Sequence, residues 1–142
     1  MKSKDKGLTI DQINVGMSAC FAKTITEADV YMFAGISGDM NPAHINEEYA
    51  KNTMFKGRIA HGMLGASLIS TVLAMHLPGP GTIYLGQNLK FLAPVRFNDT
   101  ITATCTVKEV VAEKNRIILD CVVANQDGTA VISGEATVMA PK

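Results

Sequence analysis

The chain has 142 residues, a length that suits a single domain. Its 13 Lys and Arg residues balance its 13 Asp and Glu residues, and this zero net charge argues against a general nucleic-acid-binding protein, which normally carries a basic excess. Apolar residues make up 47% of the chain and charged residues only 18%, so we expect part of the surface to be covered by another subunit.

The ends of the chain and its cysteines give no sign of export or of a membrane anchor. Residues 1–12 predict a polar tail without the apolar run of a signal peptide, and residues 13–142 predict one domain. No stretch reaches the ~18 apolar residues of a membrane span. Cys20, Cys105 and Cys121 are far apart and lack zinc-site spacing, so we expect free buried thiols, no metal site and a cytoplasmic protein.

The first elements predicted along the chain are a strand and a helix. Residues 17–25 are typical of a strand. Thr26 and Asp29 then form a capping-box pattern, in which the two side chains bond to the first free N–H groups of a helix. This pattern predicts a helix over residues 27–36, which should stop at Gly38.

Two further helices are predicted in the middle of the chain. Asn46 can cap a short helix over residues 47–51. Residues 62–76 contain no charged side chain and no polar stripe, which predicts a helix that is buried on every side. Residues 78–81, Pro-Gly-Pro-Gly, end this helix.

The rest of the chain predicts four strands. They are expected over residues 82–92, 100–111, 116–125 and 130–139, with a tight turn at 126–129. The second of these strands alternates threonine with apolar residues, which is typical of a sheet with one buried face. With the first strand, these segments predict an α+β fold in which one antiparallel sheet of about five strands packs on one apolar helix.

The segment at residues 37–44, Ser-Gly-Asp-Met-Asn-Pro-Ala-His, carries the strongest chemical signal. A carboxylate (Asp39) and an imidazole (His44) that converge on one point can hold and activate a water molecule. Pro42 disfavours a helix through this segment, and a curled loop can bring the two groups together. Taken alone, Asp39 and Asn41 are equally typical of turn residues, and a lone histidine is more often structural.

A second motif, residues 60–63, opens the apolar helix with Ala-His-Gly-Met. The free N–H groups at this helix start could face a substrate carbonyl, and Gly62 would allow close approach because it has no Cβ. The simpler interpretation is a helix start with no chemical role. Ser70 lies two turns further along, on roughly the same face as Met63, where a serine most often bonds to its own helix backbone.

These motifs together resemble those of the MaoC-like (R)-specific enoyl-CoA hydratases. Residues 37–44 resemble the hydratase motif of that family, residues 60–68 its central helix and residues 84–95 its following strand. The match runs from about residue 12 to residue 140. The resemblance implies a single hot-dog domain, with an antiparallel sheet wrapped around a long apolar helix. It also implies a homodimer, or a larger homo-oligomer, with the active site near the subunit interface.

The resemblance further implies an enzyme, a hydro-lyase that adds water reversibly to a trans-2-enoyl-CoA and gives the (R)-3-hydroxyacyl-CoA. Asp39 and His44 match the catalytic pair of the family, and Gly62 matches the residue whose N–H polarises the thioester carbonyl. Apart from the coenzyme A thioester substrate, no cofactor or metal is expected. Three further residues are expected to bind substrate or support the site: Asn41, His61 and Ser70.

Two other functions stay open at this point. One is a hot-dog acyl-CoA thioesterase, which would cleave the thioester with an activated water, and the other is a non-catalytic module that binds acyl thioesters. Asp39 and His44, with Asn41 and Pro42 between them, favour the hydratase over both. A dehydratase for acyl-carrier-protein substrates is a close variant, which a basic docking patch would favour and the neutral charge does not support.

Overall fold

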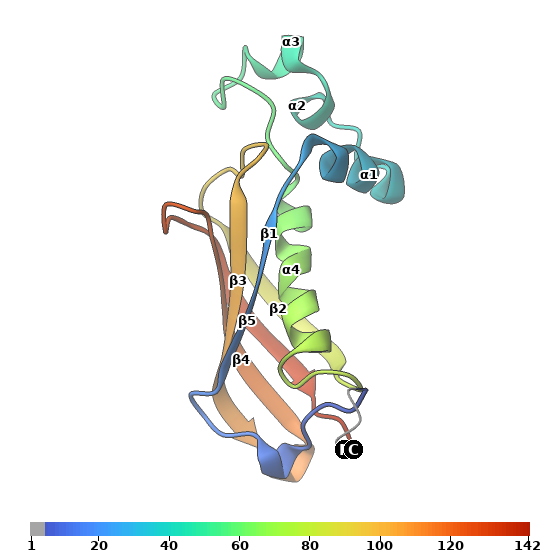
Figure 1. Ribbon diagram of the computed structural model, residues 1–142, viewed down its shortest axis with the longest axis vertical. Helices are drawn as coiled ribbons and strands as arrows, with labels where there is room; N and C mark the ends of the chain where they lie inside the picture. The colour runs from blue at the N-terminus through green and yellow to red at the C-terminus, as the bar shows by residue number, and fades with distance from the viewer. Residues whose placement is uncertain (1–4) are drawn as a thin grey trace.

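The computed structural model, which describes residues 5–142, has a curved five-stranded antiparallel sheet packed against one long helix (Figure 1). The strands are β1 (Ser18–Thr24), β2 (Ile83–Phe91), β3 (Thr100–Val111), β4 (Arg116–Ala124) and β5 (Ala130–Met139). The α-helices are α1 (Glu27–Ser37), α2 (Pro42–Ile45), α3 (Glu47–Ala50) and α4 (Gly62–Met75), and the 3-10 turns are Ile10–Gln12 and Ala112–Lys114. The predicted α+β fold is confirmed, and the sheet wrapped around α4 is the hot-dog arrangement.

The order of strands in the sheet is β1-β3-β4-β5-β2, with every neighbouring pair antiparallel. Strands β3, β4 and β5 follow one another through short turns, and the predicted turn at residues 126–129 joins β4 to β5. Gly128 has a φ of 77° there, a left-handed conformation that glycine adopts without strain. The edge strands are β1 and β2, because neither has a second neighbour among the described residues.

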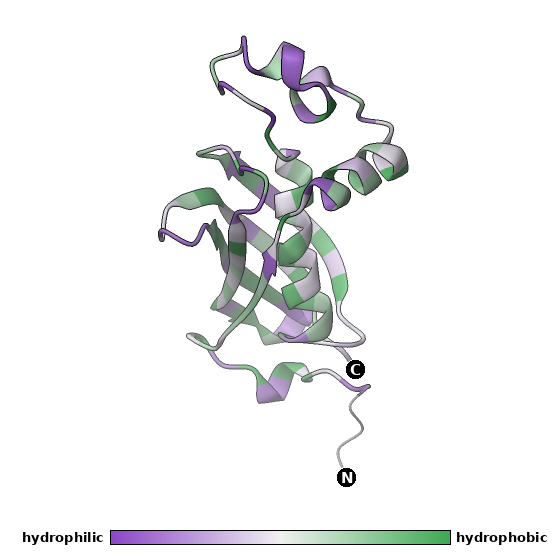
Figure 2. Cartoon of the chain, turned by 45° about the horizontal axis from the view of Figure 1, so that its top comes forward, coloured by the Kyte–Doolittle hydropathy of each residue, from purple (hydrophilic) through white to green (hydrophobic). Residues whose placement is uncertain are grey.

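The core lies between the sheet and one face of α4. The alternation predicted for β3 is confirmed: Ile101, Ala103, Cys105 and Val107 are all buried. From α4, the core receives six residues: Gly65, Ala66, Leu68, Ile69, Val72 and Leu73. Hydrophobic residues line α4 and the strands that face it, as the green segments in Figure 2 show. Burial of this apolar surface is the main force that holds α4 in the curve of the sheet.

Helix α4 is not buried on every side, so this prediction is wrong for the single chain. Met63 is 56% exposed and Met75 61% exposed, and Ser67 and Ser70 on the same side are also exposed. The reason is that the sheet covers only one face of the helix. The opposite face carries hydroxyl groups as well as methionines but no charged side chain, and the sheet of the described chain does not cover it.

Helix α1 has the boundaries that the capping box predicts. The Thr26 hydroxyl accepts a hydrogen bond from the Asp29 N–H, and the Asp29 carboxylate accepts one from the Thr26 N–H at 2.9 Å. This backbone hydrogen bond from Thr26, with a further contribution from Lys23, lowers the pKa of Asp29. The helix ends at Gly38, whose φ of 78° is left-handed, as expected of a glycine at this position.

Part of the segment predicted as a polar tail packs against the domain. The N–H groups of Gly7 and Leu8 donate to the carbonyl oxygens of Pro80 and Pro78. Leu8 and Ile10 pack against the core. Ordered packing therefore begins before residue 13, while residues 1–4 of the predicted tail lie outside the described residues. None of the helices within residues 5–142 is both long and apolar enough to cross a membrane.

Candidate active site

The site motifs lie in the segment that joins α1 to α4, at one end of the sheet (Figure 1). Arg58 fastens this segment with two ion pairs, one from Nη1 to Glu27 at 2.7 Å and one from Nε to Glu47 at 3.1 Å. Its guanidinium group also lies 4.7 Å from the centre of the Phe97 ring. The hydrogen bond to Glu27 raises the pKa of Arg58, which keeps its guanidinium group charged.

Asp39 sits in the short loop between α1 and α2, and side chains of its neighbours hold that loop. The Ser37 hydroxyl donates to the Phe33 carbonyl at 2.7 Å and accepts from the Asp39 N–H at 3.2 Å. The Asp39 carboxylate accepts from the Asn41 N–H at 3.2 Å through Oδ1. Asp39 is exposed, and its carboxylate lines a cavity beside α4.

His44 is on a helix of one turn and not on a loop, which corrects the prediction for residues 42–44. Pro42 occupies the first position of α2, where its missing N–H and fixed φ suit a helix start, and the Asn41 side chain caps the helix by accepting from the Ala43 N–H at 3.0 Å. The His44 Nδ1 lies 2.7 Å from the Ile59 carbonyl oxygen. Because a carbonyl only accepts, Nδ1 is the donor, and Nε2 is the ring nitrogen left for chemistry.

His61 immediately precedes α4 and is almost completely buried, with 2% of its surface exposed. Its Nε2 lies 2.9 Å from the carbonyl oxygen of Asp39. Gly62 and Met63 are the first two residues of α4, so their N–H groups have no acceptor within the helix. The helix start therefore offers two N–H donors next to His61, at the positive end of the helix dipole.

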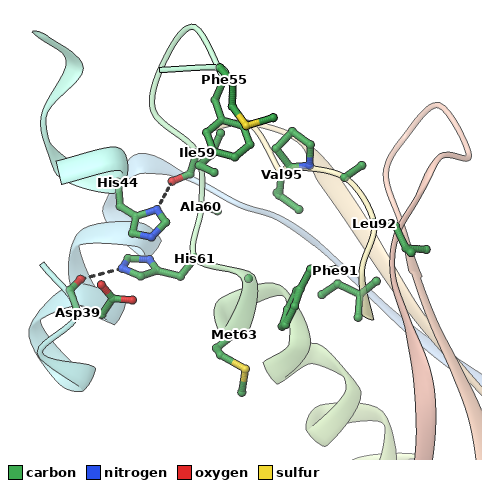
Figure 3. Close-up of a pocket in the computed structure, with 15 residues that line it drawn as sticks. Asp39, His44, Phe55, Ile59, Ala60, His61, Met63, Phe91, Leu92 and Val95 are labelled. Atoms are coloured by element: carbon green, nitrogen blue, oxygen red, sulfur yellow. Dashed lines mark hydrogen bonds between the residues drawn. The ribbon is translucent and has the colours of Figure 1, made fainter. Parts of the chain in front are cut away.

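The three polar side chains meet at one point. One ligand-type atom from each of Asp39, His44 and His61 lies within 4.8 Å of the other two. The two imidazole rings pack on each other at a tilt of 30° with their centres 3.8 Å apart, and Figure 3 shows the Asp39 carboxylate beside the His61 ring. The convergence of Asp39 and His44 that the motif predicts is therefore present.

The cluster opens into a mostly apolar cavity of about 500 Å³, large enough for an acyl chain. Phe91 at the end of β2 forms one wall, and its ring packs on Gly62. A Cβ on Gly62 would lie 2.7 Å from Phe91 Cε1, so any other residue at this position would have to displace the ring. Other apolar side chains that line the cavity are Met54, Phe55, Met63, Leu92 and Val95.

Two of the residues predicted to support the site are placed differently. Asn41 is near Asp39, but its side-chain oxygen is engaged in capping α2. Ser70 is exposed on the uncovered face of α4 and does not line the cavity. Two residues that sequence reasoning missed are Arg58 and Phe91, since an isolated arginine in a loop and a phenylalanine at a strand end carry no local signal of their role.

Aspartate and histidine are also metal ligands, and Asp39, His44 and His61 each offer one ligand atom. A metal ion needs lone pairs that converge on it, and a histidine lone pair lies in the plane of its ring. The His44 and His61 rings are tilted by 30° to each other, and one nitrogen of each ring already lies within hydrogen-bond distance of a backbone carbonyl oxygen. Each histidine therefore has only its other ring nitrogen left as a ligand, and that of His61, Nδ1, is buried.

Comparison with known proteins agrees with this geometry. Residues 12–131 match the family model described as "MaoC like domain". The chain belongs to the MaoC-like family. It is 58% identical to an "(R)-specific enoyl-CoA hydratase" of Rhodospirillum rubrum, over 92% of this chain and 90% of that protein. It is 43% identical to a "3-hydroxybutyryl-CoA dehydratase" of Methylorubrum extorquens, over 95% of this chain and 85% of that protein.

Solved structures of MaoC-like proteins share the fold. The chain is similar to the "R-Hydratase PhaJ1 from Pseudomonas aeruginosa in the unliganded form", with a TM-score of 0.90 and 46% identity. The match covers 96% of this chain and 87% of that one. The antiparallel sheet around α4 is thus the MaoC-like hot-dog domain, and the resemblance that the motifs carry is confirmed.

Proposed function

We propose that this MaoC-like protein is an (R)-specific enoyl-CoA hydratase, a hydro-lyase that adds water reversibly to trans-2-enoyl-CoA. The observation that carries the proposal is the meeting of Asp39 and His44 with the free N–H groups at the start of α4, at the edge of an apolar cavity. The names of the similar proteins, hydratase and dehydratase, describe the two directions of this one reaction.

The start of α4 has the chemistry needed to activate the substrate. Attack of water at C3 of the enoyl thioester moves electrons through the conjugated system and leaves negative charge on the thioester oxygen. The Gly62 N–H, at the positive end of the α4 dipole, stabilises this charge. The absence of a Cβ on Gly62 lets the Phe91 ring pack against the helix start, where it forms a wall of the cavity.

Asp39 and His44 hold the attacking water and move the protons. The Ile59 carbonyl occupies His44 Nδ1, so Nε2 faces the reaction as the proton acceptor or donor. One proton leaves the water as its oxygen bonds to C3, and one proton is delivered to C2, so the product gains one H and one OH. Side chains and backbone N–H groups supply every step, and we therefore propose that no cofactor or metal takes part.

We also propose that the enzyme acts as a homodimer or a larger homo-oligomer. Strand β2 is an edge strand with several exposed apolar residues, namely Ile83, Tyr84, Leu85 and Phe91. The exposed face of α4, with Met63 and Met75, adds to this apolar surface. An open, apolar sheet edge is a template for pairing with a second strand, and a second copy of β2 is a suitable partner.

The three cysteines are consistent with a reducing compartment, and we propose the cytoplasm as the location. Cys20, Cys105 and Cys121 are all free. Cys105 and Cys121 are buried at facing positions of β3 and β4 and are still unpaired, whereas Cys20 is exposed, contrary to the prediction that all three are buried.

The test is an assay with crotonyl-CoA that follows the enoyl absorbance and free thiol in parallel. We expect the absorbance to fall without thiol release and the product to be the (R)-alcohol. Release of thiol would instead identify a thioesterase. If neither signal changes with short or long enoyl-CoAs, while enoyl-acyl-carrier protein is hydrated, the substrate carrier in the proposal is wrong.

A further inference from the structure

Among the described residues, His61 is the one polar or charged residue that is buried. Burial of a polar side chain costs free energy unless its polar atoms are hydrogen-bonded. Nε2 has the Asp39 carbonyl as a partner, but Nδ1 is buried without one. A phenylalanine would fill this position without the unpaired nitrogen, so packing alone does not account for a histidine here.

The ring of His61 contacts three separate parts of the site. Its Nε2–H donates to Asp39 in the α1–α2 loop, and its face stacks on His44 of α2. On the α1 side it lies 4.8 Å from the ring of Phe33. The residue is also bonded directly to Gly62, which lines the cavity. One side chain thus links the acid–base pair to the helix start.

The bond to Asp39 matters most, because among the described residues it is the one hydrogen bond that ties Asp39 to a distant part of the chain. The other hydrogen bonds of Asp39 among the described residues go to Ser37 and Asn41, each two positions away. These local bonds shape the loop but do not fix where the loop lies relative to α4. The His61 bond spans 22 positions and ties the loop directly to the residue that precedes α4.

We infer that His61 is a positioning residue, which holds the Asp39 backbone so that its carboxylate and His44 share one water molecule above the Gly62 N–H. This inference rests on the proposed hydratase function. His61 does not transfer protons itself, because Nε2 is occupied by the Asp39 carbonyl and Nδ1 is closed off from solvent. Its effect on the reaction passes through Asp39.

Two substitutions separate the hydrogen bond from the ring. His61→Phe keeps a ring that can stack on His44 but removes the donor to Asp39. His61→Gln removes the ring but places an amide N–H near the position of Nε2. We expect His61→Phe to lower kcat about 100-fold, as a displacement of about 1 Å can do, with little change in KM and no loss of thermal stability. We expect His61→Gln to recover most of the lost kcat.

Amide hydrogen exchange over residues 38–41 gives a readout that does not depend on activity. Exchange in this loop should be faster in His61→Phe than in wild type and His61→Gln. The inference is wrong if His61→Phe keeps the wild-type kcat and exchange rates, or if His61→Gln is as impaired as His61→Phe. A wild-type protein that does not hydrate any enoyl thioester would overturn the proposed function instead, and the exchange comparison would still decide whether His61 holds the loop.

Discussion

The sheet with α4 and the segment from α1 to residue 61 are held together by different forces. The sheet encloses a core of aliphatic side chains, and its strands repeat a simple alternation. The α1–α3 segment, drawn towards one end of the sheet in Figure 1, joins the core only through Val30 and Ala60 and is held mainly by capping side chains, the Arg58 ion pairs and the His61 bond. The residues that stabilise the fold therefore differ from those that carry the chemistry. The core supports the site, and polar contacts give the site its shape.

The sharpest test replaces the acid–base residues and leaves the fold intact. We expect Asp39→Asn and His44→Ala each to reduce kcat by about 10²- to 10⁴-fold, the usual value of an acid–base group. Asp39 is exposed and His44 only partly buried, so the free energy of unfolding should change little. Near-normal turnover in either purified variant would remove the pair from the mechanism.

The second test fills the space beside the helix start. Gly62→Ala places a Cβ 2.7 Å from the Phe91 ring, so this ring, which forms a wall of the cavity, must shift. We expect kcat/KM to fall about 100-fold, with a small effect on the melting temperature. Gly35→Ala in α1 is the matched control, since a Cβ there meets no atom within 4 Å. Equal activities of the two variants would contradict the role of Gly62.

The third test acts on the core and spares the site. Val123 and Val122 are neighbours on β4 but point to opposite faces, and they are 0% and 41% exposed. Val123→Ala removes two buried methyl groups and should lower the free energy of unfolding by about 2 to 3 kcal/mol, measured by chemical denaturation. Val122→Ala should cost much less, and kcat should be unchanged in both. A comparable loss in the two variants would mean that the outer face is covered.

The smallest expected effect concerns the cap of α1. The pKa of Asp29 is lower in the folded protein than in the unfolded chain, so its contribution to stability is present above the unfolded value and is lost as the pH falls through the folded value. We expect Asp29→Asn to cost about 1 kcal/mol at neutral pH and nothing in strong acid. Unfolding free energies measured against pH, with Glu113→Gln as a surface control, test this. A difference that does not depend on pH would contradict the assignment.

The sequence alone was sufficient to predict the position of every strand and of the two long helices, α1 and α4. The strand alternation, the Thr26–Asp29 capping box and the glycine stops act over a few residues, and such local signals can be read directly. The start of α2 at Pro42 was predicted wrongly, because a proline that disfavours helix before it also favours helix after it. The motif at residues 37–44 also predicted that Asp39 and His44 would meet.

Only the tertiary structure decided which groups complete the site. The bond from His61 to Asp39 spans 22 positions, and Phe91 reaches Gly62 from another strand. The exposed face of α4 shows the same limit, since Ser67 and Ser70 are only a weak signal, in a helix without charged residues, of the side that the sheet leaves uncovered. Contacts of this kind depend on how the sheet curves around the helix, and that curvature is set by the packing of the whole core.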